Sequence, residues 1–207
     1  KFKRKTWKRK PDKGFLSGGG GVMSIMYGRI FEKVGVNIST VMGSFTEEMK
    51  NKIPGAKINP NFYATGISLV AHMHSPLIPA AHFNTRFIRT TKSWFGGGAD
   101  LTPTYINRSK NVSNFFHKNL KNTCDKYDPL FYPKYKKWCD EYFYLPHRKE
   151  KRGLGGIFFD YLDNDFDNNY SFIKDIGQTF IKTYSEIVRE KSRNVWTKKQ
   201  KIDQLYK

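Results

Sequence analysis

Polar side chains occupy alternate positions in an apolar stretch near the middle of the chain. In the stretch at 81–90 these residues are His82, Asn84 and Arg86. A β-strand places alternate residues on one face, so an imidazole, an amide and a guanidinium would lie side by side. Burying such a face is costly unless a ligand satisfies its polar groups. We therefore expect an anionic ligand to bind there.

The preceding apolar stretch, at 62–74, extends the argument. Ser68 and His72 share one of its faces by the same alternation. If the proline-containing loop between the two stretches pairs them as neighbouring strands, their polar faces converge. Asp100 would enter this patch from a glycine turn at 96–98. For each histidine alone, a hydrogen-bonded or surface residue is the alternative interpretation.

A second basic group, HRKEKRGLGG at 147–156, precedes a glycine-rich strand. It contains His147, Arg148 and Arg152. Arginine is suited to paired hydrogen bonds with a carboxylate, although a solvated run of charge is the ordinary explanation.

Motifs of several other enzyme classes are absent from the sequence. The glycine runs lack the GK[ST] of a phosphate loop, no HExxH occurs, and Ser68 lacks a nucleophile elbow.

The composition indicates a globular and strongly basic protein. Hydrophobic residues make up 38% of the 207 and aromatic residues 16%, which excludes a disordered chain. The net charge of +19 favours nucleic acid, anionic membranes, or small molecules with several carboxylates or phosphates as partners. A general abundance of lysine is the alternative, so charge alone does not choose a partner.

Cysteine usage and hydropathy favour a cytoplasmic protein. Cys124 and Cys139 are the two cysteines, without CxxC spacing, which argues against a disulfide scaffold or a cysteine zinc site. No apolar stretch approaches the roughly 18 residues of a membrane span. The basic first residues are not followed by the apolar region of a signal peptide. We therefore expect no integral membrane segment.

The order of the elements predicts an α+β fold. Strands are expected twice within 21–40 and at 62–74, 81–90, 92–103 and 153–162. Helical spacing occurs at 106–124, 129–143, 166–190 and 196–206. The start, 1–13, is expected to be a charged arm, and the strand at 92–103 to break at its glycines. We expect one domain, 1–207, with a large, mostly antiparallel β-sheet flanked by α-helices.

Four long blocks, in order, give the sequence a resemblance to a known family. They are GGGGVMSIMYGRIFEKVGVNIS, GISLVAHMHSPLIPAAHFNTRF, WFGGGADLTPTY and YPKYKKWCDEYFYLPHRKEKRGLGGIFFDYL. With them the chain resembles the oxygen-dependent coproporphyrinogen III oxidases of haem biosynthesis, over roughly 7–206. The resemblance implies a homodimeric enzyme that converts two propionates of coproporphyrinogen III to vinyl groups. Oxygen is consumed, and protoporphyrinogen IX, carbon dioxide and hydrogen peroxide are released.

The resemblance also implies roles for particular residues. The family's proton donor falls on His82. Its substrate contacts fall on Ser68 and on Asn84, Thr85 and Arg86.

A metal site is implied less directly. The metal-ligand positions of bacterial members fall on His72, His117 and His147, whereas the family is also described as needing neither metal nor organic cofactor. The resemblance therefore implies molecular oxygen as the co-substrate and no required cofactor, and the spacing of the three histidines matches no compact metal motif. A divalent metal is the alternative.

The residues themselves suit this chemistry. The substrate's four carboxylates give Arg86, Arg148 and Arg152 a reason to gather. Asp100 could accept hydrogen bonds from the pyrrole N–H groups, while His82 relays a proton near neutral pH. Oxidation could proceed by pyrrole deprotonation, oxygen addition, and loss of carbon dioxide as the peroxide leaves. A turn at 96–98 would allow a flat macrocycle to approach the backbone closely.

Two expectations concern the ends of the chain and the rival functions. Compared with relatives, the chain is expected to lack an N-terminal helix and a C-terminal, arginine- and glycine-rich segment that also serves dimerisation.

A porphyrin carrier without turnover is one alternative function. A nucleic-acid-binding module, based on the basic and aromatic residues at 1–13 and 196–201, is the other. No RNP, KH or zinc-knuckle pattern supports it, so we expect no nucleic-acid partner.

Overall fold

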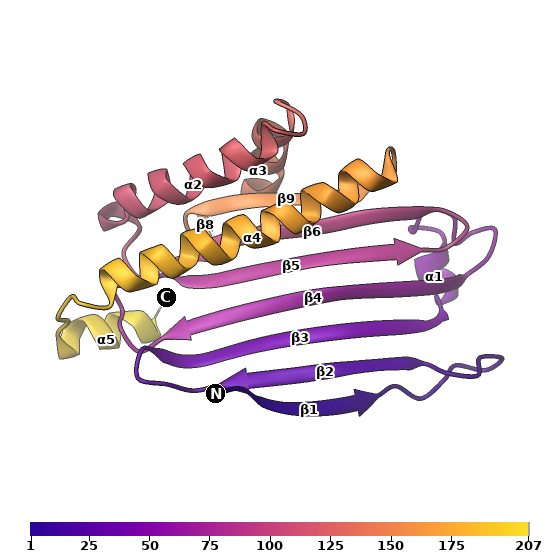
Figure 1. Cartoon of the computed structure of the whole chain (residues 1–207), viewed down its shortest axis with the longest axis horizontal. Coiled ribbons are helices and arrows are strands. Elements are labelled where there is room, and N and C mark those ends of the chain that lie inside the picture. The colour runs from indigo at the N-terminus through magenta and orange to yellow at the C-terminus, as the bar shows by residue number, and fades with distance from the viewer. Residues whose placement is uncertain (207) are drawn as a thin grey trace.

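A seven-stranded antiparallel sheet forms the centre of the computed structural model, which describes residues 1–206 (Figure 1). Its strands are β1 (Lys3–Lys8), β2 (Gly19–Met26), β3 (Phe31–Ser44), β4 (Asn61–Met73), β5 (Ala80–Arg89), β6 (Ser93–Thr102) and β9 (Gly155–Leu162). They pair in that order, so each connection along the first six strands joins direct neighbours. A separate hairpin pairs β7 (Tyr144–Leu145) with β8 (Glu150–Lys151).

Helices cover one face of the sheet and the edge at β9. The helical elements are α1 (Glu47–Lys50), the 3₁₀ turn η1 (Ile106–Arg108), α2 (Lys110–Cys124), α3 (Phe131–Tyr142), α4 (Phe166–Lys191) and α5 (Lys198–Leu205), of which α1 and α5 lie at opposite ends of the sheet (Figure 1). The long helix α4 crosses β5 and β6, with α2 beside it, while β1 to β4 have no helix over them in this view (Figure 1). Strands followed by helices, as expected, make an α+β fold.

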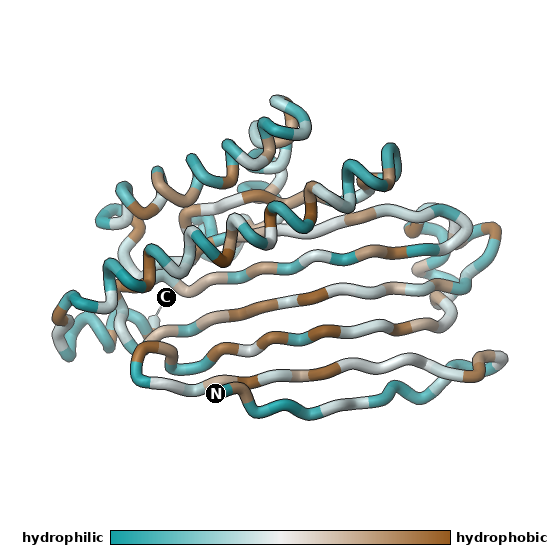
Figure 2. Tube along the Cα trace, in the orientation of Figure 1, coloured by the Kyte–Doolittle hydropathy of each residue, from teal (hydrophilic) through white to brown (hydrophobic). Residues whose placement is uncertain are grey.

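The hydrophobic core lies between the sheet and these helices. Apolar and polar residues alternate along the strands (Figure 2), so one sheet face can pack while the other stays polar. Phe83 of β5 stacks on Phe180 of α4 with ring centroids 4.9 Å apart. Phe172 of α4 is fully buried and contacts a cluster of rings from α3, β9 and the α2–α3 connection. These rings belong to Tyr127, Phe131, Tyr135 and Phe159.

Two sequence expectations about strands are wrong. The charged start is not an arm, because Lys3–Lys8 pairs with β2 as the edge strand, where charged side chains discourage pairing with other chains. Nor does the strand at 92–103 break at its glycines. β6 is paired on both sides, and the ring of Phe159 lies where a side chain at Gly97 would stand. The glycines therefore admit side chains from neighbouring strands rather than forming a turn.

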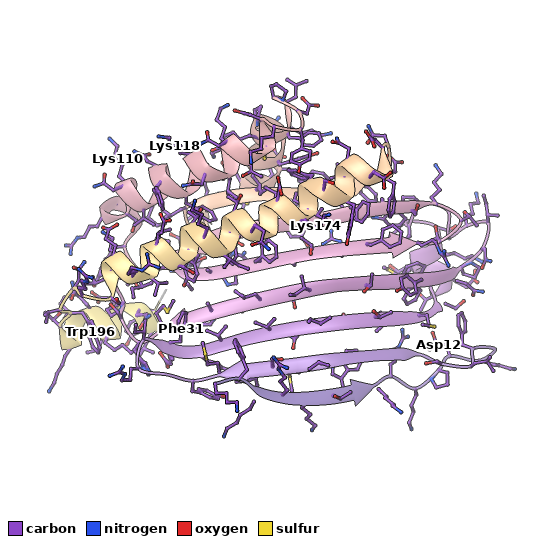
Figure 3. The ribbon with its side chains drawn as sticks, in the orientation of Figure 1. Asp12, Phe31, Lys110, Lys118, Lys174 and Trp196 are labelled. Carbon is purple, nitrogen blue, oxygen red and sulfur yellow. The ribbon has the colours of Figure 1, made fainter. Side chains whose placement is uncertain are left out.

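Parts of the positive charge lie on the helix layer. Lys110 and Lys118 project outward from α2, away from the sheet (Figure 3). Trp196 and Phe31 mark the end of the molecule where α5 lies (Figure 3).

Within residues 1–206, no helix combines the length and apolar character needed to cross a membrane.

Removing the ring at the centre of the aromatic cluster should destabilise the fold strongly. We expect Phe172→Ala to lower the free energy of unfolding by about 3–5 kcal/mol, because the cavity left in the core cannot collapse fully. Ile181→Ala on the same helix is the matched control. Its side chain is 57% exposed, so a change within about 0.5 kcal/mol is expected. Urea titration measures both, and equal losses would contradict the assignment of the core.

Candidate active site

The strand register brings the predicted polar residues onto one sheet face, here called the polar face. Ser68 lies directly opposite Asn84, and His82 lies directly opposite Asp100. Directly opposed residues of antiparallel strands point to the same side. The expected convergence of the two strands is therefore confirmed. This face is turned away from the viewer in Figure 1, because α4 covers the other one.

His82, Asp100 and Arg152 form a row across the polar face. Nδ1 of His82 lies 3.3 Å from Oδ2 of Asp100, and Nη2 of Arg152 donates to Oδ1 at 2.6 Å. Asp100 is only 4% exposed, so its charge needs such a partner. The Arg152 guanidinium also lies over the ring of Phe143, with Cζ 3.6 Å from the centroid. Asp100 enters from within a strand and not from the turn that the sequence predicted.

Arg86 and Asn84 form a second group further along β5. Nη1 of Arg86 donates to Oδ1 of Asn84 at 3.2 Å, and Nη2 donates to Oδ2 of Asp160 at 2.7 Å. Ser68 lies across the strand pair from Asn84. A shallow depression of about 240 Å³ adjoins this group, and its lining includes all three of Ser68, Asn84 and Arg86. Guanidinium, amide and hydroxyl groups together suit the binding of a carboxylate.

Thr85 does not share this face. It lies opposite Ile67 and Gly97, on the side that the helices cover. Its side chain therefore points away from the polar face, because side chains alternate along a strand. Thr85 is nevertheless among the residues that line the depression, and its contact with a substrate stays a prediction. Asp160, by contrast, was not predicted from the sequence as a site residue. The alternation in FFDYL could have indicated it, since Asp160 follows Phe158 by two positions and shares its face.

The two further arginines of the basic group separate in space. Arg152 follows β8 and reaches Asp100, as described above. Arg148 lies in the turn of the β7–β8 hairpin and forms an ion pair with Glu150, Nε to Oε1, at 3.0 Å. Lys151 is held to Asp140 of α3 at 2.8 Å. This contact holds the hairpin end next to Arg152 against α3.

The three histidines proposed as metal ligands do not come together. No group of three or more potential ligands occurs among residues 1–206. His72 borders His82, with ring centroids 6.5 Å apart, whereas His147 is exposed in the hairpin turn. Both ring nitrogens of His117 are occupied, Nε2 by the carbonyl of Leu154 at 2.9 Å and Nδ1 by the hydroxyl of Tyr132 at 3.0 Å. These residues therefore do not fit a shared metal ion.

Environment sets the protonation of several groups in and near the site. Burial lowers the pKa of His72, and the neighbouring His82 lowers it further. Burial raises the pKa of Cys139 to about 12, with Asp100 adding to the shift. Burial likewise raises the pKa of Cys124 to about 12. Because only the thiolate is nucleophilic, neither cysteine is a nucleophile near neutral pH.

Comparison with known proteins places the chain in a family. The family model for coproporphyrinogen III oxidase matches residues 1–207. The oxygen-dependent coproporphyrinogen-III oxidase of Rickettsia rickettsii (strain Sheila Smith) is 57% identical over 206 residues, covering 99% of this chain and 71% of the relative. Proteins with the same description from Rickettsia akari and Rickettsia bellii are 56% and 55% identical over the same shares. The chain belongs to the coproporphyrinogen III oxidase family.

The half-buried His117 predicts a pH dependence of stability. Burial lowers its pKa in the folded chain, so the unfolded chain takes up a proton at a higher pH. The stability linked to this group is complete above the ordinary pKa of about 6.5 and is lost as the pH falls below it. We expect His117→Gln to show a smaller drop in Tm between pH 7.5 and 5.0 than the wild type.

The exposed His147 provides the matched control. His147→Gln should keep the wild-type drop in Tm over the same pH interval, because the exposed side chain is solvated in both states. Scanning calorimetry at the two pH values measures the difference. An unchanged drop in the His117 variant would show that this group is not a source of the pH dependence.

Proposed function

We propose that the chain catalyses the oxidative decarboxylation of coproporphyrinogen III to protoporphyrinogen IX in haem biosynthesis. Two propionate side chains become vinyl groups, with oxygen consumed and carbon dioxide and hydrogen peroxide released. The observation that carries the proposal is the row of His82, Asp100 and Arg152 on the polar face. It combines a group for proton transfer, a buried carboxylate and a guanidinium in a member of this family.

The arginines give the substrate's carboxylates their binding partners. Arg86 reaches the polar face from β5 and Arg152 from the end of the hairpin. Each shares hydrogen bonds with one aspartate, and a guanidinium has five N–H donors, so donors remain for a substrate carboxylate. Ser68 and Asn84 contact the substrate from β4 and β5. Arg148, at the hairpin turn, receives a further carboxylate.

Proton balance gives His82 its role. Converting one propionate carboxylate to a vinyl group releases carbon dioxide, one proton and two electrons. Reduction of oxygen to hydrogen peroxide takes up those two electrons and two protons, so each conversion consumes one proton. His82 relays it, because an imidazole changes protonation near neutral pH. Asp100 lies beside the ring, with Oδ2 3.3 Å from Nδ1.

Asp100 also has capacity to act on the macrocycle. A carboxylate offers about four lone-pair sites, of which His82 and Arg152 face one each. The remaining sites accept hydrogen bonds from pyrrole N–H groups. Negative charge there offsets positive charge that develops when the electron-rich ring is oxidised. The reaction then follows pyrrole deprotonation, oxygen addition, and loss of carbon dioxide with the peroxide.

Assembly and location complete the proposal. Molecular oxygen is the co-substrate, and no step is assigned to a metal or an organic cofactor. We propose a homodimer in the cytoplasm, with 1–207 acting as one domain. The family resemblance supports these assignments.

Turnover in air is the first test. The protein is incubated with coproporphyrinogen III, with and without oxygen and with and without a chelator. The porphyrinogens are then oxidised to fluorescent porphyrins. Protoporphyrin fluorescence should appear only in the samples that were incubated in air. Turnover should survive the chelator. Loss with the chelator would assign a metal to the reaction. Substrate binding without turnover would contradict the oxidase proposal in favour of a carrier.

Replacing the proton relay should reduce rate far more than binding. His82→Ala should lower kcat by about 10²–10⁴, as expected for loss of general acid–base catalysis. Binding of coproporphyrin III should change by less than about threefold. The matched control is His74→Ala, an exposed histidine just beyond the end of β4, which should keep both constants. A His82 variant with equal losses in binding and rate would contradict the relay.

A further inference from the structure

Asp160 joins three strands behind the Arg86 guanidinium. Its Oδ2 accepts a hydrogen bond from Nη2 of Arg86 on β5 at 2.7 Å. Its Oδ1 accepts from Nε1 of Trp94 on β6 at 3.1 Å and from the backbone N–H of Tyr161 on β9 at 3.1 Å. Both carboxylate oxygens of Asp160 therefore accept hydrogen bonds.

An irregularity of β9 aims Asp160 at this position. The β6–β9 register shifts by one residue at Gly96, so both Asp160 and Tyr161 lie opposite one residue of β6. Tyr161 has a left-handed backbone, with φ of 58°. Such a bulge bends a strand and redirects its side chains, and it recurs beside active sites. A left-handed non-glycine residue persists only where its surroundings hold it.

Gly96 leaves the space that the Arg86–Asp160 pair occupies. A Cβ at this position would lie 2.4 Å from Oδ1 of Asp160 and 3.0 Å from Nε of Arg86. Because contacts this short do not occur in practice, any larger residue would displace the pair. Glycine here therefore serves the packing of two charged side chains across the strand.

The pair is also supported from behind. Trp94 is 3% exposed and lies opposite Ile88, on the same sheet face as Arg86, and Asp160 accepts a hydrogen bond from its indole N–H. The side chain of Asp160 is 15% exposed and that of Arg86 is 30% exposed. In front, Nη1 of Arg86 donates to the carbonyl oxygen of Asn84. This contact leaves the amide N–H groups of Asn84 pointing elsewhere, available as donors.

We propose that Asp160, held by Trp94, is a positioning residue for substrate binding. It fixes the Arg86 guanidinium, and through it the Asn84 amide, in the orientation that receives a substrate carboxylate. The proposal rests on the proposed function, which gives the polar face a tetracarboxylate ligand. Groups that are fixed before binding avoid the ordering cost of a long, flexible side chain.

A double-mutant cycle tests whether Asp160 acts through Arg86. The probe is coproporphyrin III, the stable, fluorescent oxidised form of the substrate, which carries the same four carboxylates. Asp160→Asn keeps the size of the side chain and removes the charge that holds the guanidinium. We expect Kd to rise about tenfold in this variant and at least as much in Arg86→Ala. The double variant should bind within about twofold of Arg86→Ala, because the two residues act as a unit.

Asp175→Asn is the matched control. Asp175 of α4 also accepts a hydrogen bond, from the Tyr127 hydroxyl at 2.9 Å, but in the helix layer. Its variant should show the wild-type Kd, even if its Tm falls as far as that of Asp160→Asn. Trp94→Phe should raise Kd less than Asp160→Asn, because it removes a single donor and leaves the ion pair in place.

Several outcomes would overturn the proposal. One is an unchanged or tighter Kd in Asp160→Asn, which would make Asp160 a group that neutralises Arg86. Another is a Kd in the double variant that has risen by the product of the two single-variant increases, which would show that Asp160 acts independently of Arg86. If the wild type binds coproporphyrin III and turns over substrate but the Asp160 variants give either of these contradicting outcomes, the proposed function stands without the positioning role. If the wild type does not bind the probe, both proposals are wrong.

Discussion

Strict alternation of side chains along paired strands is the constraint on which the site depends. The ladder sets His82 opposite Asp100 and Asn84 opposite Ser68, on the side away from α4. A shift of one residue would turn every one of these groups toward the helices. The stacking of Phe83 on Phe180 opposes such a shift, because it needs β5 in the observed register. Packing of the core on one face of the sheet thus determines which polar side chains lie together on the other face.

Two arginine–aspartate pairs give the polar face its electrostatic character. Arg152 pairs with Asp100 and Arg86 pairs with Asp160, at 2.6 and 2.7 Å. Each aspartate is largely buried and would be costly there without its arginine. Each arginine in turn is held in one orientation while keeping donors for a ligand. The face therefore offers two fixed cationic groups whose charge is partly compensated until an anion arrives.

The sequence predicted those parts of the site that depend on periodicity. Alternation, with pairing of the two strands through the proline-containing loop, placed Ser68, His82, Asn84 and Arg86 on converging faces, and the order of elements predicted the α+β class. It did not predict that β6 continues through its glycines. That outcome depends on pairing with both neighbours and on the ring of Phe159 over Gly97, which are long-range contacts. Alternation in FFDYL indicates the face of Asp160, but its partner Arg86 lies on β5, which is not a neighbour of β9 in the sheet. His117 could be recognised as a boundary residue, but its partners Tyr132 and Leu154 come from other elements.

The burial of both thiols has a consequence for the durability of the catalyst. The proposed reaction releases hydrogen peroxide at the polar face, and Cys139 lies in the lining of the small cavity beside Asp100 and Arg152. Peroxide oxidises the thiolate form of cysteine, first to sulfenic acid and then irreversibly. Both cysteines are fully buried, and burial keeps them as neutral thiols. The fold thereby protects both thiols from the peroxide that the proposed reaction releases.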